Sequence, residues 1–131
     1  MITAGQISNE RYITVSPSTS VGSAVSQMLD ENVSVLLVIG ADQQLVGTVS
    51  DQVLLRAAID SHLRQDPVSL HMKRQFAVVS EQAPLDVVLD QFVLHDLQFL
   101  AVAHNHGMVQ GIIGRLDLLK TVFGETPSVL S

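Results

Sequence analysis

Residues 47–53 read GTVSDQV, and residues 111–117 read GIIGRLD. In both stretches a glycine and β-branched residues lead into a short link, after which apolar residues recur at helical spacing. Placing position 12 over position 76 brings one stretch onto the other and aligns residues 12–59 with residues 76–123 without a gap. Because the apolar pattern matches along the whole aligned length, the sequence indicates an internal duplication.

Each half of the duplication predicts the order strand, helix, strand, strand, helix. In the first half, β-branched and apolar runs favour strands at 12–15, 33–39 and 45–49. Apolar residues recur every three or four positions from Val21, and Ser50 is a suitable cap for a helix ending near residue 60. Each half therefore has the pattern βαββα.

The second half predicts the same elements. A helix with Pro84 in its first turn is followed by strands at 98–103 and 108–113, with a polar turn at 104–107 between them. A last helix is expected over 115–123. Residues 62–67 predict a linker between the halves, because Asp66-Pro67 disfavours helix.

Composition and charge exclude several classes of protein. Seven Lys plus Arg against thirteen Asp plus Glu give a net charge of −6, which argues against a nucleic-acid-binding surface. Without cysteine the chain has no disulfide, thiolate nucleophile or Cys-based zinc site. The start, MITAGQISNERY, resembles no signal peptide, and the longest apolar run, Val35–Ile39, is too short to span a membrane. We expect a cytoplasmic protein with no membrane partner.

The high apolar content predicts self-association. The mean hydropathy of +0.34 is high for a chain of 131 residues, and at this size surface still outweighs interior, so some apolar residues are expected in an interface. We expect a homodimer in which apolar helix faces, within 53–58 and 116–123, meet a second copy or an unknown partner protein.

The strand-to-helix links are the places where a ligand could be bound. A helix start offers free backbone N–H groups and a positive partial charge, which together suit an anion. A hydroxyl at the cap can add a donor for phosphate, and a carboxylate three residues later can accept hydrogen bonds from a ribose diol. The two links therefore predict a site for the sugar and phosphate of a nucleotide.

These motifs resemble the CBS domain family. The βαββα unit in tandem, each closed by Gly, two apolar residues, Ser or Thr, two further residues and Asp, is similar to a CBS-domain pair, or Bateman module. The segment at 68–74, with Met72, resembles the stretch that precedes a second CBS repeat. The resemblance implies an α+β (α/β-like) fold with CBS repeats at 6–65 and 66–124, packed sheet to sheet about a pseudo-twofold axis, and a tail at 125–131.

The family's site residues fall unevenly on the two halves. In the first, Ser50 supplies the hydroxyl but Val53 replaces the ribose-binding Asp, so this cleft is expected to be the weaker one. In the second, Asp117 is present and Gly114 replaces the hydroxyl. The resemblance implies that Asp117 binds the ribose. It also implies two further sets of contacts. The residues implied to contact the phosphate are Gly114, Arg115, Lys73 and Arg74. Those implied to contact the base are Val78, Val79, Leu100 and Ala101.

Simpler explanations exist for the same residues. Asp117 could only stabilise a helix start, and Arg115, Lys73 and Arg74 could only be solvated. His104 and His106 alternate in a predicted turn, with His95 nearby, but no third metal ligand is identifiable, so a polar turn is favoured over a metal site. No catalytic motif is present, and we expect a protein that is not an enzyme.

We therefore expect a stand-alone regulatory CBS pair that requires no cofactor. It would bind AMP, ADP, ATP or S-adenosylmethionine in the second-repeat cleft and signal to a partner. The alternative is a degenerate pair that binds no ligand and serves as a dimerisation or protein-interaction module. A non-adenosyl anion or a metal in the same clefts is a third hypothesis.

Overall fold

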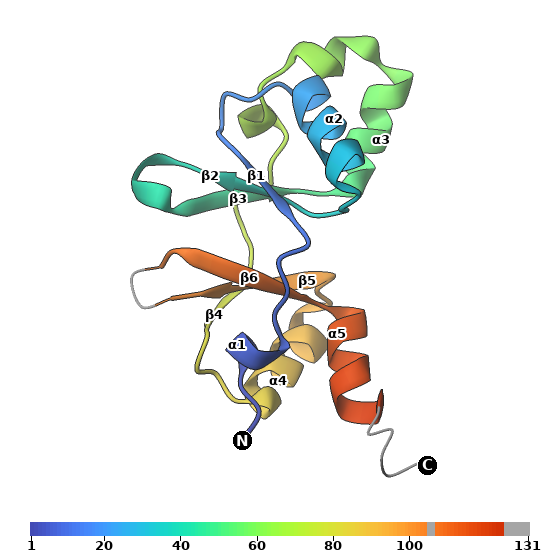
Figure 1. The fold of residues 1–131 in the computed structure, drawn as a ribbon. Coiled ribbons are helices and arrows are strands. Elements are labelled where there is room, and N and C mark those ends of the chain that lie inside the picture. The colour runs from blue at the N-terminus through green and yellow to red at the C-terminus, as the bar shows by residue number, and fades with distance from the viewer. Residues whose placement is uncertain (105–106, 125–131) are drawn as a thin grey trace. The chain divides into compact units, whose positions relative to one another are not determined.

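The computed structural model describes residues 1–104 and 107–124. His106 of the predicted turn and the tail expected at 125–131 lie outside this part of the chain. Two three-stranded sheets with accompanying helices confirm the α+β fold class (Figure 1).

The chain folds as two compact units that do not follow one another along the sequence. The continuous unit runs from Arg11 to Phe76, and the split unit combines Met1–Glu10 with the chain from Ala77 onward. The first ten residues thus belong to the same unit as the second repeat, which the sequence pattern did not predict.

The continuous unit contains a mixed sheet with two helices. Its elements are β1 (Ile13–Val15), α2 (Val21–Glu31), β2 (Leu36–Ile39), β3 (Leu45–Val49) and α3 (Asp51–Ile59). The central strand β2 pairs in parallel with β1 and antiparallel with β3. Ser20 caps α2 by accepting a hydrogen bond from the Ser23 N–H, and the helix begins at Val21, where the apolar spacing begins.

Helical turns replace part of the linker that was predicted at 62–67. A 3-10 helix occupies Ser61–Gln65, where the Asp60 carboxylate accepts from the His62 N–H. The Arg64 side chain then donates to the Ala57 carbonyl across 3.1 Å, which attaches this segment to the end of α3. The predicted linker therefore contains a capped turn, which has no apolar periodicity that the sequence pattern could detect.

The split unit repeats the same topology, and its N-terminal helix corresponds, at the offset of the duplication, to a 3-10 helix at Val68–Leu70 in the continuous unit. Its elements are α1 (Ala4–Ile7), β4 (Val78–Ser80), α4 (Leu85–His95), β5 (Phe99–Ala103), β6 (Val109–Gly114) and α5 (Arg115–Leu119), which continues as a π-helical turn over Lys120–Gly124. The sheet order is β4-β5-β6. Pro84 is the N-cap of α4, one residue before the first turn in which it was expected. Proline is tolerated at a helix start because the N–H that it lacks would have no partner within the helix there.

Small irregularities repeat together with the regular elements. The antiparallel pairs shift register between Val38 and Ile39 and, at the equivalent place in the second repeat, between Val102 and Ala103. The caps that end α2 and α4, Asn32 and Asp96, are both left-handed, with φ of 54° and 49°. A chance similarity of apolar pattern would not reproduce bulges and caps at one offset, so the structure supports the duplication.

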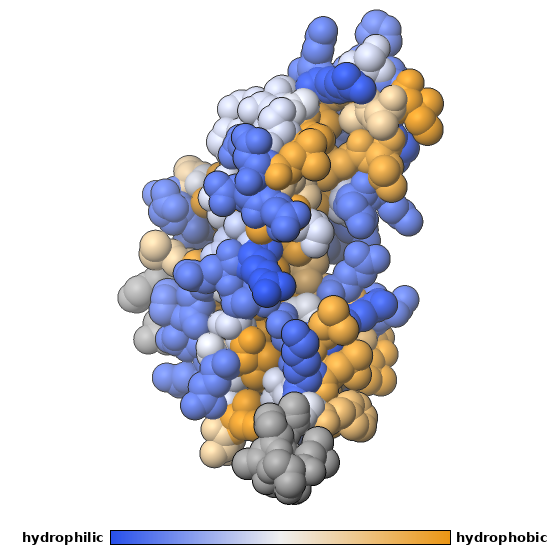
Figure 2. Space-filling model, turned by 45° about the vertical axis from the view of Figure 1, so that its right-hand side comes forward, coloured by the Kyte–Doolittle hydropathy of each residue, from blue (hydrophilic) through white to orange (hydrophobic). Residues whose placement is uncertain are grey.

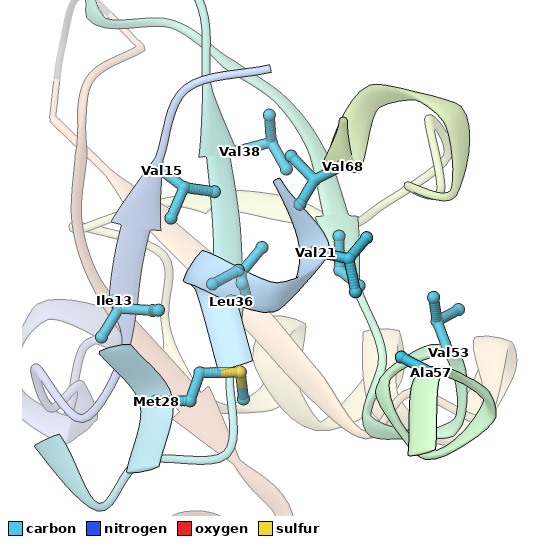
Figure 3. Packing of buried hydrophobic residues seen from close by; sticks show 11 residues of the cluster. Ile13, Val15, Val21, Met28, Leu36, Val38, Val53, Ala57 and Val68 are labelled. Carbon is cyan, nitrogen blue, oxygen red and sulfur yellow. The ribbon is translucent and has the colours of Figure 1, made fainter. Parts of the chain in front are cut away.

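Each unit has its own hydrophobic core beneath its helices. In the continuous unit, Val21 and Met28 of α2 and Val53 of α3 pack on Leu36 and Val38 of the sheet (Figure 3). The split unit has a corresponding cluster, which comprises Ala4, Val88, Leu100, Val102, Ile113 and Leu118. Ala4 is fully buried in it, so the N-terminal helix contributes to the core of the split unit.

Two short lead-in segments, residues 8–9 and 72–73, cross the last strand of each sheet. Asn9 exchanges two backbone hydrogen bonds with Ile112, of 2.8 and 2.9 Å. Lys73, which is equivalent to Asn9 at the offset of the duplication, exchanges two with Thr48, of 3.0 and 2.7 Å. A glycine lies beside each crossing because a side chain there would collide with the segment. A Cβ on Gly111 would lie 2.9 Å from the Ser8 Cβ, and one on Gly47 would lie 2.6 Å from the Met72 Sδ.

Adding a methyl group at either crossing should destabilise the protein. In Gly47→Ala and Gly111→Ala the new Cβ would also meet backbone oxygens, of Lys73 at 2.9 Å and Asn9 at 3.1 Å. We expect each to lower the free energy of unfolding by about 1–3 kcal/mol, measured by urea denaturation. Gly124→Ala is the control, since its Cβ would meet nothing closer than 3.6 Å. Equal stability of all three variants would contradict this account.

Candidate functional site

The Asp117 carboxylate lies at the junction between β6 and α5. One of its oxygens, Oδ2, accepts a hydrogen bond from the Gly114 N–H and another from the Asn9 side-chain amide, each of 2.7 Å. Asp117 is the third residue of α5, from which an acidic side chain can reach back to the N-cap. The carboxylate therefore has a defined orientation at the strand-to-helix link that the sequence singled out.

The other carboxylate oxygen of Asp117 remains available. Within residues 1–104 and 107–124, no protein group makes a hydrogen bond to Oδ1. Asp117 is half-buried, which leaves it accessible from solvent. Helix capping and ligand binding are thus compatible in this residue, since capping uses only Oδ2.

Gly114 and Arg115 already have partners within the split unit. The Gly114 N–H is used by Asp117 and is not free to bind a phosphate. The Arg115 side chain donates from Nε to the Leu97 carbonyl at 2.7 Å and from Nη2 to the Asp96 carboxylate at 3.2 Å. Asp96 is the left-handed cap of α4, so Arg115 ties the start of α5 to the end of α4. A guanidinium has five N–H donors, and these contacts use two of them.

The four residues expected around the base all lie in β4 and β5, but they do not share one face of the sheet. Leu100 is fully buried in the core beneath the helices, and Val79 packs against the same cluster. Successive residues of a strand point to opposite faces of the sheet. Val78, which is 44% exposed, and its strand partner Ala101 therefore point to the face opposite Val79 and Leu100. Only Val78 and Ala101 therefore lie on the face away from that core.

Lys73 and Arg74 belong to the continuous unit, together with Ser50. The Lys73 backbone pairs with Thr48, two residues before Ser50. Ser50 is the N-cap of α3, and its hydroxyl caps no backbone N–H. Val53 is buried in the core, so this junction lacks a carboxylate at the position where α5 has Asp117.

Sequence reasoning missed Asn9. This residue precedes the aligned range 12–59, so the repeat comparison did not include it. A signal was nevertheless present, because Asn9 and Lys73 are related by the same offset as positions 12 and 76. The sequence does not reveal the pairing itself. Asn9, which precedes the first repeat, pairs with Ile112 in the last strand of the second repeat, and Lys73, which precedes the second repeat, pairs with Thr48 in the last strand of the first.

The histidines do not assemble a metal site in the part of the chain that the structure describes. There, no group of three or more His, Cys, Asp or Glu side chains could hold a metal ion. His104 Nδ1 lies 3.2 Å from a Glu81 carboxylate oxygen, and His95 ends α4. No helix among the described residues is both long and apolar enough to cross a membrane.

Comparisons with known proteins agree with this fold. The family model described as "CBS domain" matches residues 4–60 and 68–124. CBSX2, solved in complex with AMP, is 26% identical, with 92% of this chain and 95% of that chain covered and a TM-score of 0.78. An uncharacterized conserved protein from Pyrococcus horikoshii is 27% identical, with coverages of 95% and 94% and a TM-score of 0.78.

A third solved structure is less similar in sequence. The CBS domain pair of MJ0100, in complex with 5′-methylthioadenosine and S-adenosyl-L-methionine, is 18% identical, with coverages of 95% and 98% and a TM-score of 0.80. Its likeness concerns the fold. The two matches of the family model, on the two βαββα repeats, show that this chain belongs to the CBS domain family and carries two CBS domains in tandem.

Proposed function

We propose that this protein is a regulatory CBS pair that binds an adenosine-containing ligand, AMP, ADP, ATP or S-adenosylmethionine, at the junction of β6 and α5, and signals this to a partner protein. The observation that carries the proposal is the Asp117 carboxylate, which is held through Oδ2 and has Oδ1 unbonded within the described residues. Oδ1 can accept hydrogen bonds from sugar hydroxyls.

A solved relative supports the choice of ligand. CBSX2, which is 26% identical over almost the whole of both chains, was crystallised with AMP. The sequence of the β6–α5 link, with its glycine and with Asp117, retains the ribose-binding part of the family motif. The proposed role is regulatory rather than catalytic, and it requires no cofactor.

The junction of β3 and α3 in the continuous unit is proposed as the weaker site. Val53 has no acceptor for a sugar hydroxyl and is buried in the core. Ser50, Lys73 and Arg74 lie in this unit and would favour an anion over a ribose. We therefore assign the ribose-binding role to Asp117 alone.

The main test is thermal unfolding with AMP, ADP, ATP and S-adenosylmethionine. A ligand present at 100 times its Kd adds about 2.7 kcal/mol, which should raise Tm by about 4–10 °C for a chain of this size. We expect one ligand to do so for the wild type and neither Asp117→Ala nor Asp117→Asn to respond. Each variant is compared with its own unliganded Tm, because Asp117 also caps α5.

Asp86→Ala is the matched control. Asp86 is likewise an acid in the first turn of a helix of the split unit, but it lies at the start of α4. It should keep the full ligand response. An unchanged response in both Asp117 variants would contradict the assignment of Asp117, and no response of the wild type to any ligand would favour the alternative, a ligand-free interaction module.

The proposed phosphate contact of Arg115 can be tested separately. Arg115→Ala should lower the affinity for AMP by about tenfold, the loss expected for one hydrogen bond between charged groups, and leave the affinity for adenosine unchanged. Calorimetric titration with both ligands measures this. An equal loss for both would instead reflect the structural contacts of Arg115 with Leu97 and Asp96.

We also propose that the chain forms a homodimer through apolar side chains on its helices. Exposed apolar residues occur at the same repeat positions in both units, namely Leu29 with Val93, Leu55 with Leu119, and Ile59 with Phe123. Figure 2 shows apolar surface on the helical side of each unit. On α3 the exposed apolar surface is smaller than expected over 53–58, because Val53 and Ala57 are buried in the core. A second copy is favoured because one chain offers the same pattern twice.

Charges placed on this face should prevent self-association. Ile59 is 90% exposed and Phe123 78% exposed, so Ile59→Glu and Phe123→Glu should fold normally but elute as monomers in size-exclusion chromatography with light scattering. Leu70→Glu is the control, because Leu70 is also exposed but lies outside these helices. A wild type that is monomeric at high concentration would contradict the homodimer.

A further inference from the structure

We propose that Asn9 is the positioning residue for the ribose-binding carboxylate: its side-chain amide fixes Asp117 through Oδ2 and thereby presents Oδ1 to the sugar hydroxyls of the ligand. The inference rests on the proposed function, because orienting this carboxylate matters to a ligand only if a ribose binds there. It assigns a ligand-related role to the N-terminal segment, which lies outside the link motif.

The backbone of Asn9 is held firmly enough for this role. Its N–H donates to the Ile112 carbonyl at 2.8 Å, and its carbonyl accepts from the Ile112 N–H at 2.9 Å. Just before it, the Ser8 N–H donates to the Ala4 carbonyl at 3.0 Å, and Ala4 is fully buried in the core. The Asn9 side chain therefore starts from a fixed point on β6, two residues before Gly114.

The two donors at Oδ2 determine how the carboxylate is presented. With the Gly114 N–H alone, the Asp117 carboxylate could still turn about its terminal torsion, which has a broad energy minimum. The Asn9 amide adds a second donor at 2.7 Å on the same oxygen. A carboxylate has about four acceptor positions, two on each oxygen. Oδ2 is thus filled, and Oδ1 retains two positions, the number that a vicinal diol requires.

The continuous unit provides an internal comparison. Lys73 has the same backbone pairing there, with Thr48, that Asn9 has with Ile112. The residue equivalent to Asp117 is Val53, which a side-chain amide could not orient. The amide and the carboxylate occur together in one unit and are both absent from the corresponding positions of the other, which is expected if they act as a pair.

The test compares AMP with 2′-deoxy-AMP, titrated calorimetrically into the full chain. A role in presenting Oδ1 predicts that Asn9→Ala lowers the affinity for AMP by about tenfold and lowers the affinity for 2′-deoxy-AMP less, so the preference for the ribose shrinks. Asn9→Asp has nearly the same shape but replaces the amide donor with a second negative charge. It should bind AMP more weakly still. Loss of packing alone would give the opposite order, with the isosteric Asp variant closer to the wild type.

Gln6→Ala is the matched control, because Gln6 is an exposed amide of the same N-terminal segment whose side-chain oxygen accepts from the Thr3 N–H, and this variant should keep the wild-type preference for AMP over 2′-deoxy-AMP. Thermal melts without ligand check that each variant folds. If Asn9→Ala does not fold, the comparison is made with Asn9→Asp alone. If the wild type binds AMP and both Asn9 variants retain its ribose preference, this inference is wrong and the proposed function stands. If the wild type binds no AMP, both this inference and the proposed binding of AMP are wrong.

Discussion

The structure depends on the close backbone contact between each lead-in segment and the last strand of a sheet. At Gly47 and Gly111 the segment passes so near the strand that a Cβ would overlap it, and a pair of backbone hydrogen bonds holds it in place. Together with the burial of Ala4 in the core, this contact holds residues 1–10 in the split unit. Because the two crossings are related by the offset of the duplication, one physical constraint, applied twice, organises the whole chain.

The same contact determines which side chain meets each strand-to-helix junction. In the split unit it brings the amide of Asn9 to Asp117, and in the continuous unit it brings Lys73 beside the strand that leads to Ser50. The two junctions thus share the same backbone pairing but differ in their side chains. One combines an amide and a carboxylate, which suit sugar hydroxyls, and the other has the Ser50 hydroxyl but no acceptor at Val53. A duplicated fold can therefore carry two unequal sites.

The buried and exposed apolar residues follow from the helix period. In α3, Val53 and Ala57 lie four residues apart and enter the core, whereas Leu55 and Ile59, also four apart, remain exposed. The sequence pattern identified the helix and its apolar character. The position of the sheet decides which of the two stripes is covered.

Local chemistry was sufficient to predict much of this protein. The duplication, the βαββα order and the helix start at Val21 follow from apolar periodicity, and they were confirmed. Asp117 and its link could also be singled out. The tertiary structure alone decided that residues 1–10 join the second repeat, that Asn9 meets Asp117, and that Leu100 is buried in the core rather than open to a ligand. These features depend on contacts between residues up to 108 positions apart, and periodicity within a short window carries no information about such contacts.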